Sequence, residues 1–153
     1  MSHHYLVKVV WTGNRGSGTS AYGAYARDHQ ILVRGKPVLE GSADATFQGD
    51  PHRHNPEDLL VAALSTCHML WYLHLAAEAG IVVTGYRDEA DGDMEGGSDG
   101  GRFLEVILKP TVTIQSGDPD LALSLHDEAN RRCFIANSVN FPVKHQATIL
   151  QVS

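Results

Sequence analysis

Cysteine, basic charge and uninterrupted apolar runs are all scarce in this chain, and each scarcity excludes a class of protein. Only two cysteines occur among 153 residues, too few for a small disulfide-stapled secreted domain, so we expect a reducing, cytoplasmic setting. Lysine and arginine number 12 against 18 acidic residues, and the net charge of −6 argues against a nucleic-acid partner. The opening ten residues lack the basic segment and the long apolar segment of a signal peptide.

The remaining composition is that of an ordinary globular protein. Hydrophobic residues make up 42% of the chain and charged residues 20%, which is close to the average for folded domains. A chain of this length can bury a substantial core by itself. We therefore expect residues 1–153 to form a single domain.

Residues 55–80 form the longest apolar stretch, and both of its ends carry helix-boundary signals. Asn55 is suited to the N-cap, Pro56 to the first helical position and Asp58 to a capping box, while Gly80 is suited to a left-handed C-cap. Between them the sequence is apolar almost all round, which predicts a central helix covered by protein on every side. The ionisable residues that interrupt it, and so argue against a membrane span, are Glu57, Asp58, His68, His74 and Glu78.

Cys67 lies in the middle of this predicted helix, among the small side chains of residues 62–66. Buried cysteines are common, so the helix by itself favours an inert core residue. A thiolate at mid-helix gains nothing from the helix dipole and would need a cation from elsewhere in the fold. His68 points about 100° away from Cys67 and His74 lies about two turns further along, which argues against a metal site there.

Strands and a second helix are predicted on either side of the central helix. Asp118 and Pro119 repeat the cap-and-proline start of a helix, and Cys133 lies near the end of its apolar stripe. The glycine-rich segment 96–101 separates two strand-like runs, which predicts a hairpin. The order of elements indicates an α+β fold with an antiparallel sheet. The predicted strands cover residues 5–11, 20–27, 29–33, 81–94, 102–115 and 143–152, with a loop over 40–55.

Three further motifs suggest ligand binding, but each is incomplete. The glycine-rich segment 13–18 lacks the lysine and hydroxyl residue of a P-loop, so we interpret it as a turn. His52 and His54 have no matching cysteine or carboxylate for a metal site. The acidic residues 88–93 do not have the spacing of an EF-hand. No metal and no organic cofactor is expected.

The segments around the two cysteines resemble those of one protein family. The matching residues are the N-P-E-D-L-L segment 55–60, the alanines before Cys67, and the H-D-E-A segment 126–129 that leads to Cys133. The W-T-G segment that begins at Trp11 adds a weaker match in the first hairpin. Together these pieces span nearly the whole chain, which is similar to the family of osmotically inducible protein C and the organic hydroperoxide resistance proteins (OsmC/Ohr).

This resemblance implies an intertwined homodimer with paired active sites at the dimer interface. It also implies a cysteine-based hydroperoxide reductase in oxidative-stress defence, with a hydroperoxide as substrate and no cofactor. Cys67 is the implied attacking thiolate and Cys133 the implied second member of a redox-active disulfide, which an external thiol reductant reopens. Burial by a second chain is also physically reasonable, because one small sheet can hardly cover an all-round apolar helix.

The family mechanism also uses a glutamate and an arginine. Glu57 matches the glutamate of the N-P-E segment, and its carboxylate would orient a guanidinium that lowers the pKa of Cys67. The arginine has several candidates in this chain. Arg15 in the glycine-rich turn and Arg27 in a predicted strand rank level, ahead of Arg53.

An apolar pocket is expected beside the reactive cysteine. Leu64, Trp71 and Phe134 are the residues expected to line it, and such a lining favours organic hydroperoxides over hydrogen peroxide. The same pocket supports an alternative function, in which a non-catalytic OsmC-like dimer binds a small apolar ligand and both cysteines are core residues. Rapid alkylation of the native protein at neutral pH would favour the catalytic function.

Overall fold

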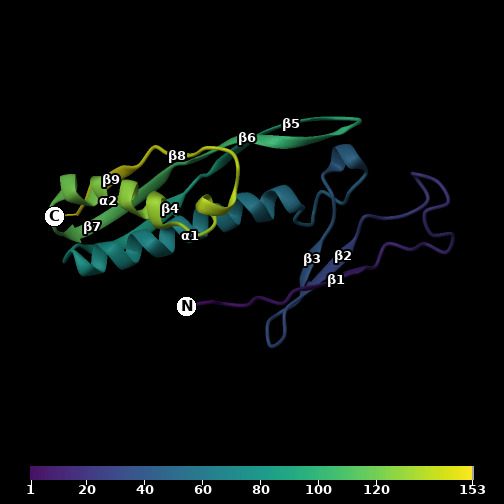
Figure 1. The fold of residues 1–153 in the computed structure, drawn as a ribbon, viewed down its shortest axis with the longest axis horizontal. Helices are drawn as coiled ribbons and strands as arrows, with labels where there is room; N and C mark the ends of the chain where they lie inside the picture. The colour runs from purple at the N-terminus through teal and green to yellow at the C-terminus, as the bar shows by residue number, and fades with distance from the viewer. Residues whose placement is uncertain (153) are drawn as a thin grey trace. The chain divides into compact units, whose positions relative to one another are not determined.

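The computed structural model describes residues 1–152, and the chain forms two compact units, Met1–Leu59 and Leu60–Ser153. The helices and strands are labelled in Figure 1. Both helices and strands occur in quantity, so the predicted α+β class is confirmed. The expectation of a single domain stays a prediction.

The first unit contains a small antiparallel sheet. Its strands are β1 (Lys8–Trp11), β2 (His29–Leu32) and β3 (Leu39–Gly41), in the order β1-β2-β3, followed by the short 3₁₀ helix η1 (Ala45–Phe47). Trp11 lies opposite His29 in the β1–β2 register. The predicted strands are therefore confirmed over the last four residues of 5–11 and the first four of 29–33.

The predicted strand over residues 20–27 was wrong, because this segment is a succession of turns. Its carbonyl groups are bound by side chains instead of by a neighbouring strand. The carbonyl oxygens of Tyr22 and Tyr25 accept hydrogen bonds from the Arg27 guanidinium, and that of Ala26 accepts one from the Trp11 indole. Backbone carbonyls used in this way are no longer free for a β ladder.

The central helix α1 (Pro56–Glu78) begins and ends at the predicted signals. The Asp58 backbone N–H donates to the Asn55 side chain at 2.8 Å, and the Asn55 N–H donates back to the Asp58 carboxylate at 3.3 Å. This reciprocal arrangement is a capping box. Gly80 ends the helix with φ of 73°, in the left-handed region that glycine adopts without a steric penalty.

Only one face of α1 is buried within this chain. The buried residues follow a single stripe with steps of four, four, three and one, and they are Leu64, His68, Tyr72, Leu75 and Ala76. The rest of the helix is half-buried or exposed. By length and composition α1 would also suffice to cross a membrane, with 28% of its most apolar window buried. The chain by itself therefore does not provide the all-round cover that the sequence predicted.

The second unit contains two three-stranded sheets. One has the order β4-β7-β9 and the other β5-β6-β8. The first sheet packs on α1 and α2 through Val112 and Ile114, whereas Val106 and Leu108 of the second sheet pack around Leu64. The strands are β4 (Val82–Asp88), β5 (Asp91–Gly97), β6 (Gly100–Leu108), β7 (Pro110–Ser116), β8 (Val143–His145) and β9 (Thr148–Gln151).

The predicted long hairpin is present, but it is divided into two pairs. Strand β5 pairs antiparallel with β6, and β4 pairs antiparallel with β7. The division falls at Lys109, whose backbone N–H donates to the Asp88 carboxylate at 2.6 Å, and Pro110 begins the next strand. Proline has no N–H for the ladder, so a break at this point is expected. The predicted last strand over 143–152 is also divided in two. Strand β8 pairs in parallel with β6, and β9 pairs in parallel with β7.

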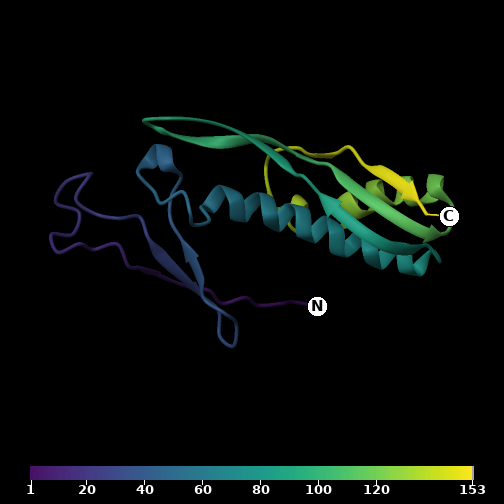
Figure 2. The same ribbon diagram turned by 180° about the vertical axis from the view of Figure 1, so that it is seen from behind.

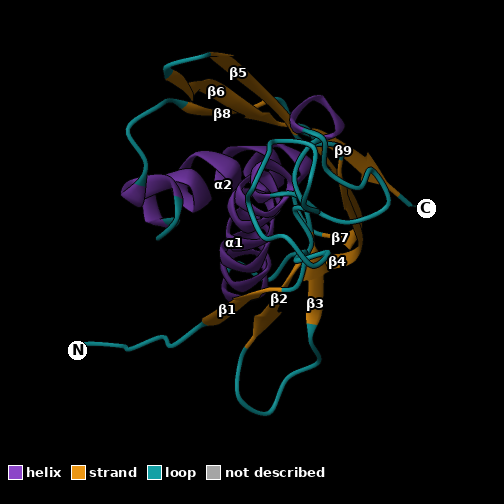
Figure 3. Cartoon of the chain, turned by 90° about the vertical axis from the view of Figure 1, so that its right-hand side faces the viewer, coloured by secondary structure: helices purple, strands orange, loops and turns teal. Residues whose placement is uncertain are grey.

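Helix α2 (Pro119–Arg132) lies beside α1 in both ribbon views (Figure 1, Figure 2). Its N-cap is Asp118, whose side chain accepts from the Asp120 backbone N–H, as predicted. The Tyr72 hydroxyl of α1 donates to the Ala122 carbonyl of α2 at 3.0 Å. A 3₁₀ turn, η2 (Ala136–Ser138), follows α2. Figure 3 shows the two helices and the strands of the second unit in separate colours.

Candidate functional site

The two cysteines, which are 66 positions apart in the sequence, meet in the second unit. Cys67 lies in the middle of α1, and Cys133 is the C-cap residue of α2. The Cys67 side chain lies close enough to Cys133 to raise the pKa of the Cys133 thiol. Both are free thiols; Cys133 is buried with 1% of its surface exposed, whereas Cys67 is partly exposed.

The two thiols differ in their surroundings. Burial, followed by the neighbouring Cys67 side chain, raises the pKa of the Cys133 thiol to about 11. The pair therefore has one partly exposed sulfur that can react and one buried thiol that keeps its proton.

One face of α2 brings Cys133 to this position. The buried residues of this face recur with helical steps of four, three and four, and they are Ala122, His126, Ala129 and Cys133. A strict four-residue step back from Cys133 leads to Leu121 and leaves this face, because a helix has 3.6 residues per turn. Leu121 is consequently 39% exposed. His126 is fully buried on this face, although histidine is a polar residue.

A buried histidine pair lies beside the cysteines and was missed by the sequence analysis. His68 Nε2 and His126 Nδ1 are 2.9 Å apart, the two rings lie edge to edge in nearly parallel planes with an interplanar angle of 5°, and the Tyr72 ring stacks on His126. Desolvation, and then the charge of His145, lowers the pKa of His68 to about 4; desolvation and then His68 lower that of His126 to about 3. Both rings are therefore neutral at pH 7. No sequence spacing links residues 58 positions apart; only the place of His126 on the buried stripe could have indicated it.

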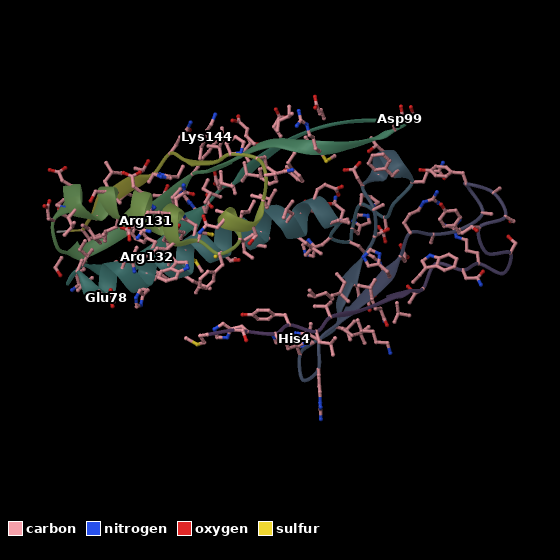
Figure 4. All side chains as sticks on the ribbon, viewed as in Figure 1. His4, Glu78, Asp99, Arg131, Arg132 and Lys144 are labelled. Carbon is pink, nitrogen blue, oxygen red and sulfur yellow. The ribbon has the colours of Figure 1, made fainter. Side chains whose placement is uncertain are left out.

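An aromatic cluster lies at the end of α2. Trp71, one turn after Cys67, and Phe134, next to Cys133, are in edge-to-face contact with ring centres 5.6 Å apart. The Arg132 guanidinium carbon lies 5.7 Å from the Trp71 ring centre. Figure 4 shows Arg132 and its neighbour Arg131 on this part of the chain, and both donate to the Glu128 carboxylate.

The pocket lining predicted from the sequence is only partly supported. A surface hollow of about 210 Å³ is lined by Leu70, Trp71 and His74. Leu64 does not line a surface, because it is fully buried in the core. Phe134 is 68% exposed.

The other predicted site residues, Glu57, Arg15 and Arg27, belong to the first unit. Glu57 is half-buried in the first turn of α1, and within residues 1–152 no salt bridge joins it to an arginine. Arg15 is exposed and makes one long hydrogen bond of 3.5 Å to the Gly23 carbonyl. Arg27 is half-buried and held by two short hydrogen bonds and two tyrosine rings.

Arg53 differs from the other arginines because it is surrounded by carboxylates. Its guanidinium lies 2.9 Å from Glu40, 3.6 Å from Asp50 and 3.8 Å from Asp28. A guanidinium with three acidic neighbours has little charge to offer a thiolate. This cluster ties the loop before α1 to β2 and β3, which is a structural role.

Metal ligands do not gather in the part of the chain that the structure describes. Residues 1–152 hold no group of three or more histidine, cysteine, aspartate or glutamate side chains placed to bind a metal ion. His74 is exposed and lies 3.4 Å from Glu78, away from the buried His68.

Comparison with known proteins supports one family. The family model described as OsmC-like protein matches residues 48–148. An OsmC-like protein of unknown function from Vibrio cholerae has a similar structure, with a TM-score of 0.85 and 28% identity over 95% of this chain and 99% of that chain. An organic hydroperoxide resistance protein OsmC from Legionella pneumophila is 15% identical, with a TM-score of 0.66 over 97% of each chain.

A curated relative is the uncharacterized protein YmaD of Bacillus subtilis. It is 22% identical over 148 residues, which are 94% of this chain and 91% of the relative. The family match extends over about two thirds of the chain and includes both cysteines. This chain therefore belongs to the OsmC-like family, which includes proteins called organic hydroperoxide resistance proteins.

Proposed function

We propose that this protein is a thiol-dependent peroxidase that reduces organic hydroperoxides through Cys67 and Cys133. The observation that supports this most directly is the closeness of a buried Cys133 thiol, whose pKa the neighbouring Cys67 raises, to a partly exposed Cys67. Two inert core cysteines would need neither this contact nor this difference in exposure. The relatives named for organic hydroperoxide resistance suggest the substrate class.

The reaction begins at Cys67. Its thiolate attacks one oxygen of the hydroperoxide, the O–O bond breaks, and the departing alkoxide takes a proton and leaves as an alcohol. Cys67 is oxidised to a sulfenic acid by this step. The Cys133 thiol then attacks the sulfenic sulfur, water leaves, and a Cys67–Cys133 disulfide forms. A thiol reductant returns two electrons and two protons and regenerates both thiols.

An arginine and a glutamate complete the proposed mechanism. A guanidinium near Cys67 would stabilise the thiolate and orient the peroxide, and the Glu57 carboxylate would orient that guanidinium. Arg27 is the stronger candidate, because its side chain is fixed whereas that of Arg15 is held by one long hydrogen bond. No metal or organic cofactor takes part. We place the protein in the cytoplasm, where thiol reductants are available.

Trp71 and Phe134 would favour an apolar leaving group. Both rings follow a cysteine closely in sequence and touch each other, so the alkyl or aryl part of an organic hydroperoxide can lie against them. Hydrogen peroxide has no such part. We therefore expect cumene hydroperoxide to be reduced faster than hydrogen peroxide.

The first test of this function is the Cys67→Ser variant. Serine has a similar size but is a far weaker nucleophile at neutral pH, so kcat/KM for cumene hydroperoxide should fall roughly a thousandfold or more. Peroxide consumption is followed with a dithiol reductant in excess, and circular dichroism checks the fold. Consumption by Cys67→Ser at the rate of the wild type would refute the thiol mechanism.

The alternative function, a dimer that binds a small apolar ligand without catalysis, rests on the hollow beside Trp71. That hollow measures about 210 Å³, which is below the roughly 300–1,000 Å³ of most small-molecule sites. Alkylation of native protein at pH 7 distinguishes the two functions. Rapid, selective reaction at Cys67 supports the peroxidase, and two inert cysteines support the binding protein.

A further inference from the structure

A buried pair of histidines links α1 to α2 within the second unit. His68 of α1 has 1% of its surface exposed and His126 of α2 has none. One ring nitrogen of each lies 2.9 Å from the other, so one ring donates a hydrogen bond and the other accepts it. Because water cannot compete for a bond at this depth, the bond is stronger than the same contact at a surface.

The helices place both histidines close to the cysteines. His68 directly follows Cys67 in the middle of α1. His126 lies about two turns before Cys133 on the same buried face of α2. Since the rise and rotation per residue of an α-helix are fixed, the position of each histidine determines that of the cysteine on the same helix.

An aromatic contact supports the same arrangement but constrains it less. Trp71, one turn after Cys67, meets Phe134, the residue after Cys133, edge to face with ring centres 5.6 Å apart. Such contacts are favourable over separations of roughly 4.5–7 Å. A hydrogen bond tolerates a range of only about half an ångström and needs a defined direction. The histidine bond is therefore the stricter constraint on how the two helices are placed.

Stability alone does not account for a histidine pair at this interface. Transfer of an imidazole from water to a protein interior costs more than transfer of a leucine side chain. Replacement of a buried polar pair by apolar side chains of similar shape can be neutral or even stabilising. A buried polar residue between helices instead fixes their register, as a single asparagine does in a coiled coil.

We propose that His68 and His126 are positioning residues, whose hydrogen bond fixes α1 against α2 so that Cys67 and Cys133 can form a disulfide. This inference rests on the redox-active cysteine pair of the proposed function, but it does not depend on the peroxide. The histidines act through the two helices. They keep the thiols at a high effective concentration relative to each other, which favours the disulfide over two separate thiols.

Equilibration with glutathione measures this effective concentration without peroxide. The two protein thiols react with one oxidised glutathione and give the Cys67–Cys133 disulfide and two reduced glutathione molecules, so two electrons and two protons pass to glutathione. The equilibrium constant has the units of a concentration. Samples are quenched with acid, and intact-mass spectrometry gives the fraction that is two hydrogens lighter. A wild type without this species, even in oxidised glutathione alone, would overturn the inference.

Two double variants separate the bond from the volume of the rings. His68→Leu/His126→Leu fills the same space without the bond, so the effective concentration should fall about tenfold, which raises the reduction potential by about 30 mV. In His68→Gln/His126→Asn the side-chain amides reach about the positions of the two bonded nitrogens and can donate and accept. This variant should stay within about threefold of the wild type. His126→Leu alone serves if the double leucine variant does not fold.

Tyr72→Phe is the matched control for a general loosening of the same interface. It removes the 3.0 Å hydrogen bond from the Tyr72 hydroxyl to the Ala122 carbonyl and keeps the ring that stacks on His126. Ala122 lies about three turns from Cys133, so stability in urea should fall while the effective concentration stays within about twofold. Equal losses for Tyr72→Phe and the leucine variant, or no gain for the glutamine–asparagine variant over the leucine variant, would overturn the inference.

The proposed function can fail separately from this inference. If the wild type reduces hydroperoxide through Cys67 but the leucine variant keeps the effective concentration of the wild type, the peroxidase stands and the positioning role is wrong. If the effective concentrations change as expected but the wild type does not reduce hydroperoxide, the positioning role stands and the peroxidase is refuted.

Discussion

The asymmetry between the two thiols is the most informative feature at the scale of single residues. Cys133 is buried, and burial together with the neighbouring Cys67 side chain raises the pKa of its thiol to about 11. Deprotonation of Cys133 before peroxide arrives would therefore be costly. Once Cys67 carries an oxygen, the same contact places the Cys133 sulfur next to its target, so the buried thiol is suited to the second step of the reaction.

Cys133→Ser should consequently react once and then stop. One equivalent of cumene hydroperoxide should convert wild-type protein to a species two hydrogens lighter, as a disulfide requires, because the two thiols are neighbours in the fold. The variant has no resolving thiol and should instead gain one oxygen, then a second as sulfinic acid forms. Intact-mass spectrometry distinguishes these products. Wild-type protein that only gained oxygen would show that Cys133 is not the resolving residue.

At the scale of elements, the interface between α1 and α2 decides whether the thiols meet. The face of α2 that carries Cys133 also carries His126, and His126 bonds to His68 next to Cys67. Whichever ring donates, one nitrogen on each histidine is left buried without a partner in the described structure. The neighbouring His145 disfavours a positive charge on this pair, and the Asp88 carboxylate favours one on His68.

The histidine pair should make the fold sensitive to mild acid. Because burial depresses both pKa values below the 6.5 of an unfolded histidine, to about 4 and about 3, the unfolded chain binds more protons below pH 6.5. The folded state therefore has its full stability above pH 6.5, and it loses stability as the pH falls toward the pKa values of the two histidines in the folded protein. The free energy of unfolding should drop by about 1.4 kcal/mol per pH unit for each histidine.

Urea unfolding between pH 7 and pH 5 measures this slope, because carboxylates are ionised in both states over most of that range. The matched control is His74→Gln, which removes an exposed histidine and should leave the slope unchanged. His126→Gln should flatten the slope and lower stability at pH 7. A slope near zero in the wild type would contradict the burial of two neutral histidines.

Local signals in the sequence predicted the helices well, since caps depend on neighbouring residues. Asn55, Asp58 and Gly80 act where the sequence indicated. The segment 20–27 was mispredicted for the opposite reason: its carbonyls are bound by Arg27 and Trp11, and composition does not reveal such bonds. Strand β8 pairs in parallel with β6, and β9 pairs in parallel with β7. The choice of partner strand depends on the path of the chain in three dimensions, which the alternation of apolar residues does not encode.

The candidate site was predicted unevenly for a similar reason. The contact between Cys67 and Cys133 followed from the family resemblance, because no spacing rule joins two residues on different helices. The histidine pair beside them had no motif and was found only in the structure. Leu64 was placed in the pocket because an apolar helix position looks the same in sequence whether it faces the core or a surface.

For the whole molecule, the exposed apolar surface of α1 is the main unexplained feature within one chain. Its most apolar window has a mean hydropathy of 1.5 but is only 28% buried. Leu70 is 63% exposed, and nearby Phe134 is 68% exposed. A helix of this kind is stable in water only when another apolar surface covers it. We propose that a second copy of the chain provides this surface, in the homodimer that the family resemblance implies.

Obligate homodimers stay associated at a protein concentration of about 10 µM. Light scattering at that concentration should therefore give twice the 16.6 kDa mass of one chain. Leu70→Asp places an unpaired charge on the exposed face of α1 and should weaken the dimer at least tenfold, because such a charge is costly to bury. Ser124→Asp, on an exposed position of α2, is a charge-matched comparison. If the dimer is the form that covers α1, Leu70→Asp should also bind the dye ANS more strongly than Ser124→Asp. A monomeric wild type at this concentration would refute the homodimer and leave the apolar face of α1 to a different partner.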